Sequence, residues 1–442
     1  MKNFFVCAMI LFILTSCKTK PADEPVNDVT INTFYSTSYL FEAVMNYNNE
    51  NRGSNVIISE FMDPSVTVTN AETGTVESVG SVNDDTYEKY YMQLNTKIMS
   101  GKAEDIFFFS NNTFPVKKYA SMNVFHDLSE FILNSAEFNE DDYYMNAVDA
   151  VKAALNGQYA LPVFWNFHPL AFNSPLINNT GLFIEDNIRA MTFTEIIDLS
   201  KKLIDETTLE NAFFFRKGRI ENDLIDITNK FIIEKYDEFV DTDNNKVFFN
   251  TDKFIKLIET VYELKENYPQ MPEDLPYDNV FFPYTQNFAF SIVNLSQANP
   301  GAVERPVLVS GKNGKISTNM ICFAINGKSN KKEEAWDFIK YMLSEDFQAM
   351  HPGLTVGINR NAFEYKIESY YKNAGELYNI NYDQDQIKGM FREWASLVNV
   401  YSITDINIET IIKEELQLYF TDEKTSHETA DSIQRRAEMY LN

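Results

Sequence analysis

The chain has 442 residues, enough for about two to three domains, and its 44% hydrophobic content provides a sizeable core. Its 64 acidic residues outnumber 38 basic ones, which gives a net charge of −26 and a surface that repels nucleic acid and anionic lipid. The composition therefore excludes nucleic acid as a partner, and four widely spaced histidines give no sign of a metal cluster.

The N-terminus has the pattern of an export signal. Lys2 precedes an apolar run at 4–14, which is shorter than the about 20 residues that span a bilayer and is typical of a signal peptide. The run ends in Leu14-Thr15-Ser16-Cys17, which matches the bacterial lipoprotein box. That resemblance implies that 1–16 is removed and that Cys17 is lipidated at the start of a polar tether, 17–28. The alternative is an ordinary signal peptide with an incidental cysteine.

Cysteine usage agrees with this interpretation. Cys7 lies in the signal peptide and Cys17 would carry lipid, so Cys322 is the remaining thiol of the folded part. An intramolecular disulfide is then excluded, and stability must come from hydrophobic cores. No second hydrophobic segment reaches spanning length, so we expect the protein outside the cell, attached at its N-terminus.

After the tether, the pattern predicts a strand–helix–strand unit, the element of parallel sheets. Val29–Tyr35 is typical of a strand, Ser36-Thr37-Ser38 of a loop with a helix cap, and 39–47 carries a helical apolar stripe. Val56–Ile58 is the second strand. The segment Met62–Asp85, rich in Thr, Ser, Val and Gly, predicts an inserted β-hairpin or long loop.

The next unit ends in polar residues. A helix begins near Asp84 and ends at Gly101, and Asp105–Phe109 predicts a short buried strand. Asn111 and Asn112 follow that strand. Open α/β sheets bind ligands just beyond the carboxyl ends of their strands, although asparagines also favour an ordinary turn.

The stretch Gly157–Asn173 predicts two short β-runs around an aromatic loop. Its insert from Pro162 to Pro169 contains Phe164, Trp165, Asn166, Phe167 and His168 between prolines, which interrupt sheet ladders. Rings give contact area and amides give directional hydrogen bonds, so the loop is a candidate ligand wall. The alternative is that its rings are core.

Helices become more frequent towards the C-terminus. The apolar patterns predict five helices. One follows the capping box Thr192–Glu195, one lies at Lys253–Glu266, and one has a wide apolar face at 335–343. The last two lie at about 409–420 and, after the Thr425/Glu428 capping box, at 427–441.

Three types of functional motif are incomplete or absent in this sequence. Asp241, Asp243 and Asn245 resemble the start of a calcium loop, but Lys246 replaces its glycine and Asp252 its final glutamate, so we read a turn. The pair Gly314-Lys315 lacks the first glycine of a phosphate loop. The mature chain has no HExxH, GxSxG or CxxC pattern, and we predict no catalytic residue, no metal site and no cofactor.

Several segments resemble family 1 of the extracellular solute-binding proteins, the carbohydrate receptors of ABC importers. Tyr87–Phe109 is similar to the helix–Gly–Asp–strand signature of that family. Further similar segments, in family order, are Val124–Ile132, Gln158–Asn173, Thr192–Ile204, Ser329–Gln348 and Glu409–Leu441.

The resemblance implies an α/β, two-lobed, periplasmic-binding-protein-like fold of type II, with hinge-linked lobes around a central ligand cleft. It places 29–137 plus 288–341 in lobe 1 and 138–287 plus 342–442 in lobe 2. It also implies a monomeric, non-catalytic lipoprotein on the extracellular face of a bacterial cell membrane. That protein would capture a carbohydrate, an oligosaccharide, for ABC permease subunits.

The same resemblance implies the position of the ligand site. A sugar offers apolar C–H faces ringed by hydroxyls, which flat aromatics and fixed hydrogen-bonding groups complement. The candidate ligand-binding residues are Ser36, Ser38, Tyr39, Phe109, Asn111, Asn112, Trp165, Asn166, His168, Phe214, Phe215, Asn294, Ser296, Lys315 and Ser317.

Two departures from the family limit this transfer. The Met62–Asp85 insert is longer than usual, and Phe281–Gln297 lacks the glycines and tryptophan common there. The identity of the ligand therefore stays open. The acidic surface favours a cationic ligand or a peptide in the same fold as one alternative, and a surface adhesion protein or enzyme is the other.

Overall fold

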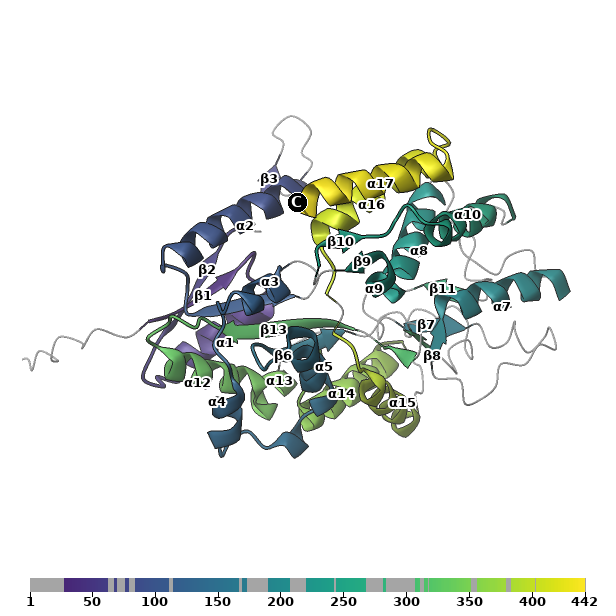
Figure 1. Ribbon diagram of the computed structural model, residues 1–442. Coiled ribbons are helices and arrows are strands. Elements are labelled where there is room, and N and C mark those ends of the chain that lie inside the picture. The colour runs from purple at the N-terminus through teal and green to yellow at the C-terminus, as the bar shows by residue number, and fades with distance from the viewer. Residues whose placement is uncertain are drawn as a thin grey trace, which may run out of the picture.

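Two hydrophobic cores organise the chain, and Figure 1 shows their elements as two bodies side by side. The computed structural model describes residues 28–62, 67–69, 76–78, 84–110, 114–166, 169–172, 190–206, 220–241, 244–267, 281–283, 307–310, 314–316, 318–350, 356–378, 383–401 and 403–441.

The first core surrounds a six-stranded mixed sheet in the order β14-β6-β13-β5-β1-β2. β1 pairs in parallel with β2 and β5, whereas β13 runs antiparallel to both β5 and β6. The predicted parallel unit is confirmed. The strands are β1 (Val29–Thr33), β2 (Val56–Glu60), β5 (Ile106–Ser110), β6 (Leu161–Asn166), β13 (Asn319–Ile325) and β14 (Val356–Gly357).

Ring contacts show that both faces of this sheet are covered. Successive side chains of a strand point to opposite faces. In β5, Phe108 contacts Tyr39 of α1 at a ring distance of 6.0 Å, whereas Phe107 and Phe109 contact Phe114 at 6.2 and 4.4 Å. The helices of this core are α1 (Ser38–Asn49), α2 (Asp84–Met99), α3 (Val116–Ser121), α4 (Ser129–Asn134), α5 (Met145–Leu155), α12 (Lys332–Leu343), α13 (Glu345–Met350), α14 (Arg360–Tyr378) and α15 (Gln384–Leu397), with a 3₁₀ turn at Glu140–Asp142.

Strand β6 corrects one prediction. We expected Pro162 to end a strand and open a loop, but β6 continues through it to Asn166. The register against β13 shifts between Ile321 and Cys322, beside Pro162, so an irregularity accommodates the residue that lacks an N–H. The aromatic residues that follow Pro162 are therefore strand residues of the sheet.

The second core combines a four-stranded sheet, in the order β11-β7-β12-β8, with a helical layer. Both predicted capping boxes are confirmed. Glu195 accepts the Thr192 N–H at 2.7 Å, and Glu428 accepts the Thr425 N–H at 2.9 Å. The elements are β7 (Pro169–Phe172), β8 (Ala190–Thr192), α7 (Phe193–Glu206), α8 (Ile220–Glu234), α9 (Tyr236–Phe239), β9 (Val240–Asp241), β10 (Lys246–Val247), α10 (Asp252–Asn267), β11 (Phe281–Pro283), β12 (Val307–Ser310), α16 (Ile406–Phe420) and α17 (Ser426–Leu441).

The rejected calcium motif forms part of a turn. Asp241 Oδ1 accepts the Asn244 N–H at 3.1 Å, and Asn245 adopts a φ of 51° before β10 begins. The carboxylate thus stabilises a hairpin between β9 and β10. The inserted segment after β2 likewise contains a hairpin, since β3 (Thr67–Thr69) pairs antiparallel with β4 (Val76–Ser78).

The chain passes between the two cores three times. β6 belongs to the first sheet and β7 to the second; β12 belongs to the second sheet and β13 to the first. The last passage lies between Tyr401, in the first core, and Ile408, in the second.

The lobe boundaries predicted at 138, 288 and 342 can be compared with the places where the chain passes between the cores. The boundaries themselves stay a prediction. The segments 138–165 and 347–401 contribute to the first core, although we assigned them to lobe 2. A periodic apolar face shows that a helix is buried but not which core buries it. The two cores favour boundaries near 167, 311 and 402 instead.

Trp165→Ala is expected to lower the free energy of unfolding by about 3–5 kcal/mol, because it leaves a cavity in the first core. Trp165 is fully buried, with ring distances of 5.2 Å to Tyr144 and 6.2 Å to Phe363. Urea unfolding measures the change, with Phe41→Ala as the control because Phe41 is 56% exposed. Wild-type stability with a loss of ligand binding would instead make Trp165 a ligand contact.

Candidate ligand-binding site between the two cores

The carboxyl ends of the parallel strands meet at one edge of the first sheet. β1 and β2 end together, and their following loops are joined by hydrogen bonds from Phe61 N to Thr33 O (3.1 Å) and from Met62 N to Phe34 O (2.8 Å). Open α/β sheets bind ligands at this edge.

The same edge faces the passages to the second core. β6 is parallel to β5, so it ends at this edge, where Asn166 pairs with Asn319 at the start of β13. The first sheet is therefore left by β6 and entered again by β13 at this edge. The space between the cores adjoins the strand ends, where we expected the ligand cleft.

Four rings gather at the ends of β1 and β2. Phe34 stacks on Tyr87 with a centroid distance of 4.3 Å and an interplanar angle of 18°. It also contacts Tyr35 edge-on at 5.9 Å and Phe61 at 6.0 Å. Tyr35 is 45% exposed, so this ring is open to a ligand while Phe34 anchors it. We call Phe34, Tyr35, Phe61 and Tyr87 the strand-end aromatic cluster.

Polar groups flank the strand-end aromatic cluster. Glu60, at the exposed end of β2, accepts the backbone N–H of Ser36 at 3.0 Å. Ser38 is exposed at the first turn of α1, which Thr37 caps by accepting the Leu40 N–H. Of the predicted residues in this loop, Ser36 and Ser38 are accessible to a ligand.

Tyr39, by contrast, is part of the core. Its ring contacts Phe164 at 5.0 Å and is 8% exposed, and burial raises the pKa of its hydroxyl well above the usual range. The structure therefore favours a packing role for this side chain.

A polar network supports the floor of the site. Tyr90 donates to Asn32 Oδ1 at 2.6 Å, and the Asn32 amide donates to Glu104 at 3.2 Å. Ser59 donates to the same carboxylate at 2.8 Å, and Lys97 forms an ion pair with it. Beside the network lies a cavity of about 260 Å³, to which Glu60 and Phe61 contribute. Because these groups are already paired, the network fixes the strand ends rather than reacting.

The other predicted site residues divide into three groups. Phe109 and Trp165 are buried, which favours the core alternative for both rings. Lys315 is exposed in a passage between the cores, where its ammonium lies 2.8 Å from Asp237 of α9. The backbone of Asn166 ends β6 at the edge of the first sheet where the parallel strands end. The remaining predictions lie outside the described residues: Asn111, Asn112, His168, Phe214, Phe215, Asn294, Ser296 and Ser317.

Sequence reasoning missed Tyr35, Phe61 and Glu60. The signal was present, because Tyr35 directly follows a strand that begins a parallel unit and Glu60 ends the paired strand. Tyr87 lies in the helix predicted to begin near Asp84, and we did not predict it as a site residue. Pairing the two strands in register brings all these residues to one edge.

The described residues hold no group of three or more His, Cys, Asp or Glu side chains that suits a metal ion. Within the same residues, no helix combines the length and apolar character needed to cross a membrane. The arrangement at the edge of the sheet is suited to binding, with ring faces beside a carboxylate and hydroxyls.

Comparison with solved structures gives the fold class. The sugar-binding protein MalE from Xanthomonas citri superposes with a TM-score of 0.60 at 12% identity, covering 94% of this chain and 97% of that one. A putative oligosaccharide periplasmic-binding protein from Synechococcus sp. MITs9220 gives 0.57 at 15% identity, covering 93% and 98%. Maltose-bound MalE3 from T. maritima gives 0.53 at 16% identity, covering 93% and 99%. The predicted two-lobed, type II periplasmic-binding-protein-like fold is confirmed.

A search of curated protein sequences finds no match. The model of the bacterial extracellular solute-binding proteins, however, matches residues 56–349, more than half of the chain. The match runs from β2 to α13 and thus includes parts of both cores. The chain therefore belongs to the bacterial extracellular solute-binding protein family, whose members bind solutes outside the cytoplasm rather than catalyse reactions.

Proposed function

We propose that this protein captures a carbohydrate, an oligosaccharide, and delivers it to the permease subunits of an ABC importer. The observation that carries the proposal is the strand-end aromatic cluster beside Glu60 and Ser36, at the edge facing the second core. Ring faces pack against the C–H faces of a sugar, and the carboxylate accepts from its hydroxyls. The sugar, oligosaccharide and maltose ligands named for the structural relatives support the same class.

The proposed mechanism is closure of the two cores around the ligand. The strand-end aromatic cluster supplies one wall. The second wall would come from the other core and from predicted residues outside the described part, among them His168, Phe214 and Phe215. The protein would act as a monomer without catalytic activity or cofactor.

Two of the three passages between the cores are joined, which restricts the closing motion. The Asn399 side chain accepts the Ile316 N–H at 2.8 Å and donates to Gly314 O at 3.0 Å. The N–H groups of Asn399 and Val400 both donate to Ile316 O, at 3.0 and 3.1 Å. These segments are therefore expected to bend together as one hinge.

We further propose that Cys17 is lipidated and that residues 18–28 tether the folded part to the outer face of the cell membrane. The lipoprotein box at Leu14–Cys17 supports this attachment.

Tyr35→Ala is expected to weaken saccharide binding about tenfold, or about 1.4 kcal/mol, because it removes an exposed ring from the wall. Isothermal titration calorimetry against a panel of mono- and oligosaccharides measures the change. Phe248→Ala is the control, since Phe248 is also an exposed ring but belongs to the second core region near β10. Heat with a polyamine or a peptide, and none with any saccharide, would overturn the carbohydrate assignment in favour of the cationic or peptide alternative.

Ligand should make the protein more compact. Small-angle scattering is expected to give a smaller radius of gyration with saturating saccharide than without it, because closure brings the two cores together. An unchanged radius with saccharide bound would favour an adhesion protein, which has no need to close.

Cys17→Ser is expected to release the protein from the membrane fraction into the medium or periplasm, because the variant has no thiol to carry lipid. Cell fractionation with immunoblotting measures the distribution, and Cys7→Ser is the matched control within the signal peptide. Continued membrane attachment of the Cys17 variant would contradict the lipid anchor.

A further inference from the structure

A large open groove lies on the first core, away from the candidate site. Its volume is about 810 Å³, and its lining comes from the end of α1, from α12 and α13, and from α14. Pockets of roughly 300–1,000 Å³ are typical of small-molecule sites. The family match and the cleft between the cores do not account for this groove.

The groove is separate from the strand ends. All its lining residues lie in or beside helices of the first core, and none comes from the second. α1 begins at the strand-end edge with Ser38, whereas the groove meets the other end of this helix, at Glu50 and Arg52. A helix of 12 residues is about 18 Å long, so one compact ligand does not fill both places.

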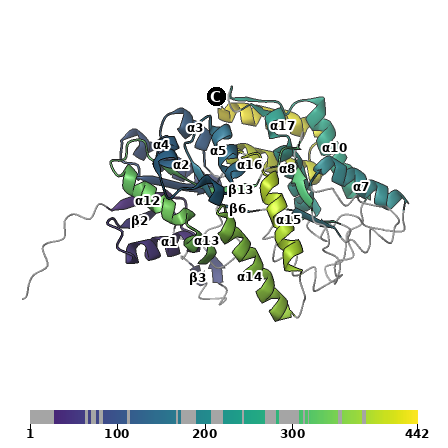
Figure 2. The same ribbon diagram turned by 90° about the horizontal axis from the view of Figure 1, so that it is seen from below.

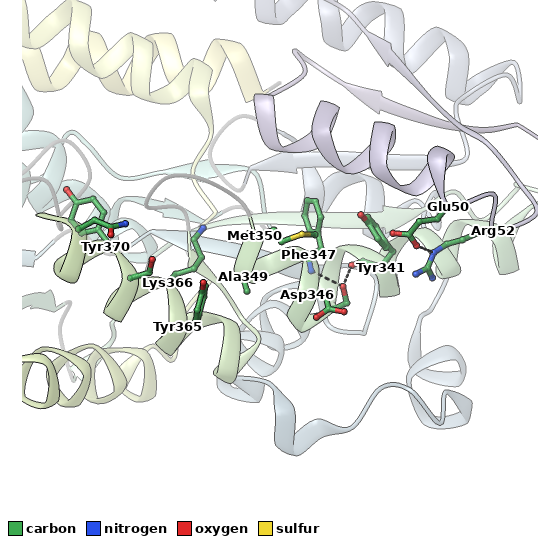
Figure 3. A pocket seen from close by; sticks show the side chains of 13 residues that line it. Glu50, Arg52, Tyr341, Asp346, Phe347, Ala349, Met350, Tyr365, Lys366 and Tyr370 are labelled. Atoms are coloured by element: carbon green, nitrogen blue, oxygen red, sulfur yellow. Dashed lines mark hydrogen bonds and ion pairs between the residues drawn. The ribbon is translucent and has the colours of Figure 1, made fainter. Parts of the chain in front are cut away.

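Two rings of α14 line the groove where a ligand can reach them, the exposed Tyr365 and the half-buried Tyr370. Figure 3 shows the labelled residues of the groove in a row, from Tyr370 at one end past Phe347 to Arg52 at the other. Tyr341 and Phe347 form a buried floor beneath them, at 6% and 2% exposure and a ring distance of 5.3 Å. Tyr365 is 60% exposed, so its ring surface is open to a ligand. These two accessible rings along an elongated groove suit a ligand that has ring faces of its own.

The charges in the groove are balanced, although the chain as a whole carries −26. Its lining has two acidic residues, Glu50 and Asp346, and two basic ones, Arg52 and Lys366. The Arg52 guanidinium is bound by Glu50 at 2.7 Å and lies over the Tyr341 ring at 5.0 Å. A balanced lining favours a neutral polar ligand over a cation or an anion.

Hydrogen-bonding groups alternate with the rings. Lys366 is only 7% exposed, and burial lowers the pKa of its ammonium to about 8. Ser369 and Asn373 add a hydroxyl and an amide along the same groove. Flat apolar faces with interspersed donors and acceptors complement a chain of sugar rings.

We propose that the groove between α1, α13 and α14 is a second saccharide-binding site, which takes a short neutral oligosaccharide independently of the cleft between the cores. This site goes beyond the proposed function, because its ligand contacts only the first core and its occupation requires no closure.

Hydroxyl-radical footprinting with mass spectrometry tests the two sites separately, with maltotriose as the probe over a concentration series. We expect oxidation of Met350 and Tyr365 to fall about threefold at saturation, because a bound ligand is largely enclosed by its pocket. Met99 is the control, since it is 82% exposed on α2 outside the groove. Tyr35 reports on the cleft in the same experiment.

Protection of Met350 and Tyr365 that persists in a Tyr35→Ala variant would show that the groove binds by itself. Tyr365→Ala is the second variant, and its exposed position makes misfolding unexpected; it should abolish the protection of Met350 and leave that of Tyr35 unchanged. Protection at Tyr35 alone would overturn the groove site and leave the proposed function standing. Protection in the groove alone would support the groove and count against the cleft.

Discussion

The pairing of β13 with both β5 and β6 is the interaction on which the arrangement of the molecule depends. β13 returns from the second core and runs antiparallel between two strands that run parallel to each other. The first residues of β13 therefore lie at the carboxyl ends of β5 and β6. The chain thus connects the two cores at the same edge of the sheet where loops follow the parallel strands. If β13 ran parallel to its neighbours, the connection from β12 would enter the sheet at the opposite edge, away from Tyr35 and Glu60. The location of the cleft thus follows from strand direction.

Local features of this fold could be predicted from the sequence, because a few neighbouring residues determine them. The capping boxes at Thr192 and Thr425 and the turn at Asp241 depend on hydrogen bonds that span three residues. The parallel β1–α1–β2 unit followed from its apolar periodicity in the same way. The resemblance of scattered segments to the solute-binding family then supplied what local patterns lack, the order in which these pieces assemble.

The roles of the aromatic residues could not be predicted in this way. A ring after a proline reads equally well as a ligand wall or as core, and the choice depends on which strands pair and in which register. In the structure, β6 continues through Pro162, so Trp165 points into the first core and Phe109 stacks on Phe114. Tyr35 was overlooked because its place beside Glu60 depends on the pairing of β1 with β2 and not on the residues next to it in sequence. The lobe boundaries also depend on long-range packing, since the helices of 356–401 carry apolar faces that suit either core.

The third passage between the cores is anchored at both ends, which restricts where a hinge can bend. On the first core, Tyr401 is buried against Cys322, whose Sγ donates to its hydroxyl at 3.8 Å; burial raises the pKa of this thiol to about 12, so it stays neutral and apolar in character. On the second core, Asp405 caps α16 and accepts from the Tyr440 hydroxyl at 3.1 Å, and its backbone N–H donates to the Tyr236 hydroxyl at 3.0 Å. Figure 1 shows the start of α16 and the end of α17 beside α2. Figure 2 shows α14 and α15 side by side below the first sheet. A chain that is fixed at 401 and again at 405 bends over few residues, and the Asn399 contacts tie that bend to the passage at 314–316. Such short, coupled hinges let two rigid cores close as bodies around a ligand without loss of the packing within either one.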